Sequence, residues 1–159
     1  MGLFWSIAGI ESVRRGIQVT PQFCKMKHQP PHSYGDCLRA CVATVMDFEP
    51  DFVPHFADKG VSGEQALADV RKWFGQRGLT VACFAFPGSE SLSDLLDFME
   101  QMNPTVTYLL FGSTTTDGPS DHVNVCKGGK IIHDPSWVPN SIKAPSSDGI
   151  WQIWVIARL

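Results

Sequence analysis

The sequence has no apolar run long enough to cross a bilayer as a helix, which takes about 20 residues. Its longest apolar stretches, Leu3 to Ile10 and Ile150 to Ala157, are far shorter. It also has no run of lysine or arginine, and its formal net charge is -3 at pH 7. We therefore expect no membrane span, and we expect no nucleic acid or anionic lipid among its partners, because no basic surface would attract them.

The sequence also lacks the marks of export. No basic residue precedes the apolar stretch at residues 3–10 and no small-residue cleavage site is obvious, so we expect no signal peptide. Met1-Gly2 with Ser6 matches a myristoylation pattern only weakly. The five cysteines, an odd number, then indicate reduced thiols in a cytoplasmic protein.

What is present is the composition of an ordinary folded domain, with 43% apolar and 18% charged residues in a chain of 159. A chain of this length forms one hydrophobic core without needing a second domain. We interpret residues 1–27 as an N-terminal extension and residues 28–159 as the domain. The sequence contains no internal repeat and no low-complexity segment.

The spacing of apolar residues predicts three helices, each with a local start signal. They begin at Cys37 with Asp36 as N-cap, after Ser62 in a capping box with Gln65 and with Gly78 as C-cap, and after Ser91. Strand-like runs occupy residues 79–86, 105–111 and 151–157, and a hairpin spans residues 122–133 around Gly128-Gly129. This order predicts an α+β domain with helices on one side of an antiparallel sheet.

The residues that suggest chemistry are a cysteine at a helix start and a histidine and an aspartate on the hairpin. A helix N-terminus favours a thiolate, so we expect the pKa of Cys37 to be lowered there. The hairpin brings His122, near the start of its first strand, close to Asp134, which follows its second strand. A nucleophilic cysteine needs a base, and the base needs a group that orients it. Cys37, His122 and Asp134 fit these three roles.

Three segments resemble the motifs of the bacteriocin-leader-processing cysteine peptidases and their papain-like relatives, including small phage and bacterial proteins. The segments are Gly35 to Ala43, His122 to Val125 and His133 to Pro135, and the phage-type proteins also share Val53 to Phe56. The resemblance implies a papain-like fold with N-terminal helices packed on an antiparallel sheet. It also implies a thiol protease or amidase that uses a Cys37-His122-Asp134 triad on a peptide or protein substrate, with no metal or cofactor.

The sequence departs from this family pattern at the oxyanion hole. The family has a glutamine about six residues before the nucleophile, where this chain has Pro31. Gln29 lies two residues further upstream, and we expect its amide to act as the second oxyanion donor after the backbone N–H of Cys37. The family's glycine after the cysteine is replaced by Leu38.

Two other functions compete with the hydrolase. One is a zinc site, because Cys37 and Cys41 on the helix and His122 and Cys126 on the hairpin are two pairs of potential ligands. The other is a papain-like binding module with little or no turnover, which the displaced glutamine favours. No segment of the sequence specifies the substrate or the bond that is cleaved.

Overall fold

The computed structural model describes residues 20–115 and 121–159. Within these residues, no helix is both long and apolar enough to cross a membrane. The described elements are, in chain order, α2 (Cys37–Met46), two short 3-10 turns (Pro50–Phe52 and Asp58–Gly60), α3 (Gly63–Gly75), β1 (Leu79–Pro87), α4 (Leu92–Met102), β2 (Thr107–Ser113), β3 (Asp121–Lys127), β4 (Lys130–His133) and β5 (Ile150–Arg158).

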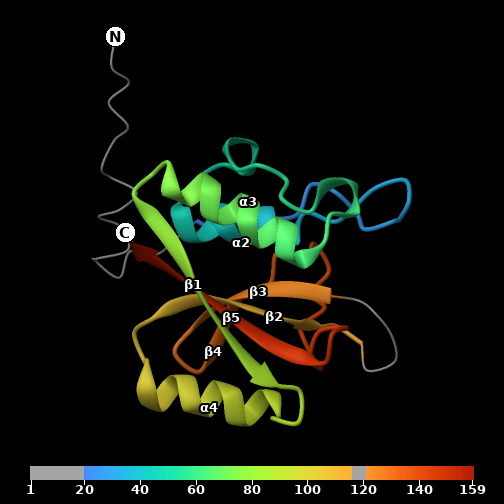
Figure 1. Cartoon of the computed structure of the whole chain (residues 1–159). Coiled ribbons are helices and arrows are strands. Elements are labelled where there is room, and N and C mark those ends of the chain that lie inside the picture. The colour runs from blue at the N-terminus through green and yellow to red at the C-terminus, as the bar shows by residue number, and fades with distance from the viewer. Residues whose placement is uncertain (1–19, 116–120) are drawn as a thin grey trace.

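The five strands form one sheet in the order β1-β5-β2-β3-β4, and every neighbouring pair is antiparallel (Figure 1). The last strand, β5, lies between β1 and β2, where it pairs along its whole length with β1. This leaves β1 and β4 as the two edges of the sheet. The predicted α+β class with an antiparallel sheet is confirmed.

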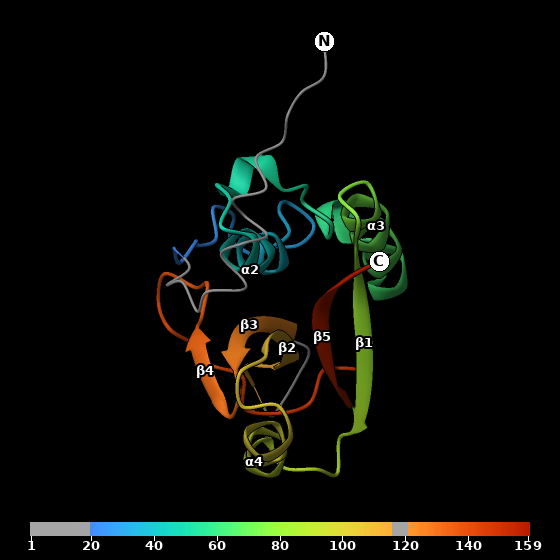
Figure 2. The ribbon, with the colours of Figure 1, turned by 90° about the vertical axis from the view of Figure 1, so that its left-hand side faces the viewer.

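The helices do not all lie on one side of the sheet, so that part of the prediction was wrong. Helices α2 and α3 cover one face, and α4 covers the other (Figure 2). Alternate residues of a strand point to opposite faces, and here both faces are apolar. Leu109, Val123 and Val125 join the core under α2 and α3, while Leu110 and Cys126 join the core over α4. A sheet that is apolar on both faces needs a helix on each.

Local sequence signals explain where the helices begin. Ser62 Oγ accepts a hydrogen bond from the backbone N–H of Gln65 at 3.2 Å, and Ser91 Oγ accepts one from Asp94 at 3.1 Å. Both N-cap predictions are confirmed. The Gln65 side chain does not complete a capping box, because its amide donates to Asp69 instead. Helix α3 ends at Gly75, and Gly78 lies in the following turn with a φ of +69°.

The predicted hairpin is present as β3 and β4. Its turn passes through Gly128, which has a φ of +52°, and the turn packs closely against α4. Glu100 Oε2 accepts a hydrogen bond from Gly129 N at 2.7 Å, and Tyr108 Oη donates to the Gly128 carbonyl at 2.8 Å. These contacts fix the hairpin and therefore the positions at its open end, where His122 and Asp134 lie.

Candidate active site

The structure brings His122 and Asp134 together. His122 is the second residue of β3, and Asp134 comes directly after β4, so the antiparallel hairpin places them side by side. His122 Nε2 lies 2.9 Å from Asp134 Oδ1, and both side chains are about 10% exposed. A carboxylate at hydrogen-bond distance orients the imidazole ring.

Asp134 is itself held in place by backbone groups. Its Oδ1 also accepts from Ser136 N at 2.9 Å, and its Oδ2 accepts from Asn140 N at 3.0 Å. Burial disfavours the charged carboxylate, but the hydrogen bonds from Ser136, His122 and Asn140 outweigh it, so the pKa of Asp134 is lowered. Asp134 is therefore an ionised acceptor at neutral pH. It stabilises the proton on His122 Nε2, which leaves Nδ1 of a neutral ring as the basic nitrogen.

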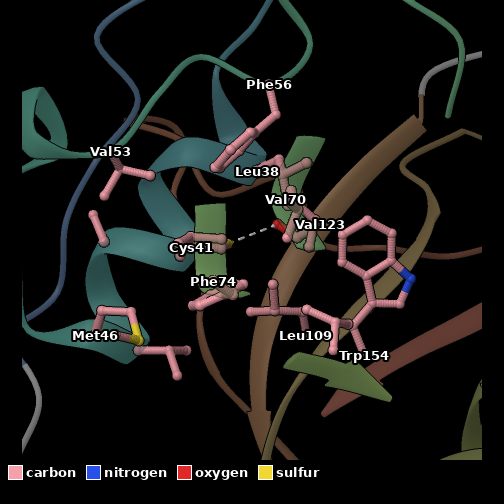
Figure 3. Close-up of a cluster of buried hydrophobic side chains, with 14 of the residues drawn as sticks. Leu38, Cys41, Met46, Val53, Phe56, Val70, Phe74, Leu109, Val123 and Trp154 are labelled. Carbon is pink, nitrogen blue, oxygen red and sulfur yellow. Dashed lines mark hydrogen bonds between the residues drawn. The ribbon is translucent and has the colours of Figure 1, made fainter. Parts of the chain in front are cut away.

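Helix α2 packs directly on β3 beside His122. The Cys41 thiol donates to the Val123 carbonyl at 3.4 Å, and both residues are fully buried (Figure 3). Cys37 lies one turn earlier on α2, and backbone hydrogen bonding from Val123 also acts on its thiol. Cys37 is thus adjacent to β3 at the residue that follows His122. Within the described part of the chain, the structure contains no hydrogen bond between the Cys37 thiol and the His122 ring.

The pKa of Cys37 is raised to about 11, whereas the sequence predicted that the helix start would lower it. Burial is the main cause, because the thiol packs against the core under α2 and α3. Backbone hydrogen bonding from Val123 and Leu38 acts in the opposite direction but is weaker than the burial. Without a cation beside it, Cys37 is therefore a neutral thiol at neutral pH.

Asp36 occupies the N-cap position of α2, but its side chain does not cap the helix as predicted. The carboxylate is fully buried and accepts hydrogen bonds from the backbone N–H groups of Lys25 and Met26 and from the Arg39 guanidinium. The carboxylate therefore bonds to the N-terminal segment and to Arg39 of α2, and it does not bond to the free N–H groups of the helix. Asp36 thus joins that segment to the start of the helix that carries Cys37.

The segment Thr20–Met26 lies between α2 and the loop after β4. Its Cys24 N–H donates to the Pro135 carbonyl at 2.9 Å, and the Trp137 indole donates to the Cys24 carbonyl at 2.6 Å. On the other side, Gln22 N donates to Thr44 Oγ1 at 2.9 Å. Residues that the sequence analysis assigned to an N-terminal extension therefore contact both elements of the candidate site.

Cys24 is a site neighbour that sequence reasoning did not find. Burial raises its pKa to about 12, and the nearby acidic groups of Cys37, Asp36 and Asp134 add to that effect when they are ionised. Cys24 is 110 residues from Asp134 in the chain, and no motif or periodicity marks it. Only a long-range signal between these positions would have revealed it.

Gln29, the predicted oxyanion donor, lies in a turn near the start of α2. Its backbone N–H donates to the Ser33 carbonyl at 2.9 Å, and its carbonyl accepts from His32 N at 2.9 Å. The residue is exposed, and no hydrogen bond of its side chain is present in the described residues. Its role as an oxyanion donor stays a prediction. In α2 itself, the first backbone bond runs from Ala40 N to the Asp36 carbonyl, so the N–H of Cys37 lies before the intrahelical ladder.

The four potential zinc ligands do not converge. Cys37 and Cys41 face the core under α2 and α3, but Cys126 belongs to the core on the opposite face, next to Tyr108. In the described residues, no group of three or more histidine, cysteine or acidic side chains is arranged to hold a metal ion. The arrangement opposes the zinc interpretation.

Comparison with known proteins gives no match. No family model matches this chain, and no curated protein or solved structure is similar to it at a significant level.

Proposed function

We propose that this protein is a cysteine hydrolase of papain-like type that cleaves a peptide or amide bond. Cys37 is the nucleophile, His122 the base and Asp134 the group that orients the base. The observation that carries the proposal is the 2.9 Å hydrogen bond between His122 and Asp134, formed where α2 brings Cys37 against the next residue of β3. An ionised aspartate that is held by two backbone N–H groups and bonded to a histidine supports general-base catalysis by that histidine.

The proposed reaction runs in two halves. His122 Nδ1 takes the thiol proton of Cys37, and the thiolate attacks the carbonyl carbon of the scissile amide. The carbonyl oxygen becomes an oxyanion near the Cys37 N–H and, in the proposal, the Gln29 amide. The C–N bond then breaks, the imidazolium gives its proton to the leaving amine, and a thioester remains. Water, deprotonated by His122, hydrolyses the thioester and releases the acid and the free thiol.

The raised pKa of Cys37 makes this proposal testable without a substrate. With a pKa of about 11, only about one thiol in 10⁵ would be ionised near pH 6, so alkylation there would be very slow. If His122 becomes an imidazolium beside the thiolate, the ion pair removes this penalty. We therefore expect iodoacetamide near pH 6 to label Cys37 selectively, because burial also raises the pKa of Cys24, Cys41, Cys83 and Cys126.

The labelled residue is identified by mass spectrometry of the digested protein. His122→Ala should suppress labelling of Cys37 at pH 6 and leave the slow labelling of the other four thiols at pH 9 unchanged. His55→Ala is the matched control, because His55 Nε2–H donates to the Tyr34 carbonyl at 3.0 Å and not to a residue of the hairpin. Preferential labelling of Cys24 or Cys126, or unchanged reactivity in a folded His122→Ala protein, would overturn the assignment.

A binding module with the same fold but little turnover is the second candidate. The observation that favours it is the exposed Gln29 at the place of a needed oxyanion donor. The two functions are separated by a panel of electrophilic peptide and ubiquitin-like probes. A hydrolase forms a stable covalent adduct between Cys37 and an electrophilic probe, and it cleaves the matching peptide that carries an ordinary amide bond. A binding module binds that peptide and leaves it uncleaved.

A further inference from the structure

We propose that Cys24 and Cys37 form a redox pair: oxidation joins their thiols in a disulfide that blocks Cys37, and reduction restores the free thiol. Such a pair regulates the proposed active site, and in that respect it rests on the proposed role of Cys37. Its formation can nevertheless be measured without a substrate or turnover.

Backbone hydrogen bonds hold Cys24 beside the start of α2. The N–H of Lys25, the next residue, donates to Asp36 Oδ1 at 3.0 Å and to Oδ2 at 3.2 Å. Met26 N donates to the same Oδ1 at 3.0 Å. Asp36 directly precedes Cys37. Cys24 and Cys37 are therefore each the chain neighbour of a residue in the bond between Lys25 and Asp36.

The loop after β4 holds Cys24 from its other side. The N–H of Cys24 donates to the Pro135 carbonyl at 2.9 Å, and its carbonyl accepts from the Trp137 indole at 2.6 Å. Both backbone polar groups of Cys24 are thus bonded to the segment that carries Asp134. Moving Cys24 away from the candidate site breaks these bonds.

Electrostatics shows that the two thiols are neighbours. Among the charged groups that act on the Cys24 thiol, Cys37 has the largest effect and raises the pKa of Cys24, followed by Asp36 and Asp134. Cys37 and Cys24 are likewise the two charged groups that act most strongly on the Cys41 thiol. Because the Coulomb interaction weakens with distance, these three thiols lie close together.

Exposure selects Cys24 and Cys37 from the five cysteines, all of which lie in the described residues. Both are partly exposed, whereas Cys41 and Cys126 are buried. Cys83 is also partly exposed, but it lies on β1, and the groups that act on its thiol come from α3 and β5. Cys24 is thus the accessible thiol beside Cys37 that an oxidant from solution can join to it.

Hydrogen peroxide supplies the oxidation in two steps. The Cys37 thiolate attacks one peroxide oxygen, the O–O bond breaks, and the departing hydroxide takes up the thiol proton as water. Cys37 is then a sulfenic acid. The Cys24 sulfur attacks the Cys37 sulfur, the S–O bond breaks, and the departing hydroxide takes the Cys24 proton as a second water. Two thiols are oxidised to one disulfide, and one peroxide is reduced to two waters.

The first step prepares the second. An ionised Cys37 raises the pKa of Cys24, but a sulfenic acid is neutral at neutral pH and no longer does so. Cys24 therefore ionises more readily after Cys37 has been oxidised than before. This order makes Cys37 the thiol that meets peroxide and Cys24 the thiol that resolves it.

The test is oxidation of the full chain with a small excess of hydrogen peroxide, then alkylation of remaining thiols, digestion without reductant and mass spectrometry. We expect one major disulfide, between Cys24 and Cys37. Because a disulfide requires Cα atoms within about 7 Å of each other, its formation reports directly on the placement of Cys24. Labelling of Cys37 by iodoacetamide should fall by about tenfold or more and return after dithiothreitol.

Cys24→Ser is the variant that separates a pair from a single oxidised thiol. It should form no disulfide with Cys37 and should carry Cys37 on to the sulfinic acid, which dithiothreitol does not reverse. Cys83→Ser is the matched control, because Cys83 is the other partly exposed cysteine, and it should oxidise like the wild type. Circular dichroism melting shows that each variant is folded.

The redox pair and the proposed hydrolase fail in different experiments. If His122 does not activate Cys37, peroxide reacts slowly, but diamide at pH 9, which accepts the two thiol hydrogens, should still join Cys24 to Cys37 and so support the pair. A major disulfide between any other two cysteines of the wild type would overturn it. So would the absence of a disulfide with both oxidants, even where iodoacetamide labels Cys37 at pH 6.

Discussion

The two edges of the sheet, β4 and β1, differ in how many polar contacts they make with the rest of the chain. At the β4 edge, the neighbouring chain is joined to other elements by polar contacts: His133 to the Gln22 carbonyl, Cys24 to Pro135, and Asp134 to His122. At the β1 edge, the strand is longer and has no charged residue of its own, and the Arg71 guanidinium of α3 lies 3.5 Å from its Val81 carbonyl. Segments from elsewhere in the chain thus bond to the β4 edge, where the candidate site lies. The β1 edge, which is far from the site in the strand order, has fewer such contacts.

The largest expected effect comes from breaking the link between the N-terminal segment and α2. Asp36→Ala removes a buried carboxylate and leaves the Arg39 guanidinium and the N–H groups of Lys25 and Met26 without their acceptor. We expect the free energy of unfolding to fall by about 3 kcal/mol, measured by urea denaturation.

Asp36→Asn is the milder control, because its amide oxygen still accepts from the two N–H groups but no longer neutralises Arg39. If Asp36→Ala lowers the free energy of unfolding by less than about 1 kcal/mol, the N-terminal segment does not stabilise the β4 side of the sheet. The difference between the two edges would then be only one of strand length.

Asp134 should contribute both to the reactivity of Cys37 and to the loop after β4. We expect Asp134→Ala to slow alkylation of Cys37 near neutral pH by about 100-fold, because His122 loses the carboxylate that orients it and stabilises its charge. Asp134→Asn should cost less, since the amide oxygen still accepts a hydrogen bond. The alkylation rates of both variants are measured by quenching the reaction at successive times and quantifying labelled Cys37 by mass spectrometry.

The same substitutions distinguish a mechanistic role from a purely structural one. Asp134 also accepts from Ser136 N and Asn140 N, so Asp134→Ala should lower the melting temperature as well. If the alanine variant melts earlier but its Cys37 reacts at the wild-type rate, Asp134 only shapes the loop. A Cys37–His122 pair would then act alone.

The lowered pKa of Asp134 predicts a pH dependence of stability on this side of the sheet. In the unfolded chain the carboxyl has a pKa of about 3.9, and folding lowers it. The stability that it contributes is therefore fully present above pH 5 or so and is lost as the pH falls through the folded-state value. The difference in unfolding free energy between wild type and Asp134→Ala should be constant from about pH 5 to pH 7 and shrink below about pH 4. If the difference in unfolding free energy stays constant below about pH 4, folding does not lower the pKa of Asp134.

The smallest effect is expected at the β1 edge. Phe84 is half exposed and makes no polar contact in the described residues, so Phe84→Lys should change the unfolding free energy of the protein by less than about 0.5 kcal/mol. Urea denaturation measures it. A loss above about 2 kcal/mol would mean that Phe84 is part of the core.

The sequence by itself determined the elements whose signals are local. Ser62 and Ser91 cap the helices that follow them, and Gly128 permits the turn that pairs β3 with β4. His122 and Asp134 are only twelve residues apart, on the two strands of one hairpin, so their approach follows from the turn alone. Short-range hydrogen bonding and turn geometry are sufficient for these features.

Tertiary structure alone decided the rest, because the contacts involved join residues far apart in the chain. Whether α4 lies on the face of α2 or on the opposite face depends on which alternate residues of β2 and β3 it covers, and both sets are apolar. The carboxylate of Asp36 accepts from the backbone N–H groups of Lys25 and Met26, and not from those of the helix, because the N-terminal segment lies against it. The pKa of Cys37 is raised because its thiol is buried against the core, and burial is a property of the folded chain that the helix start does not reveal.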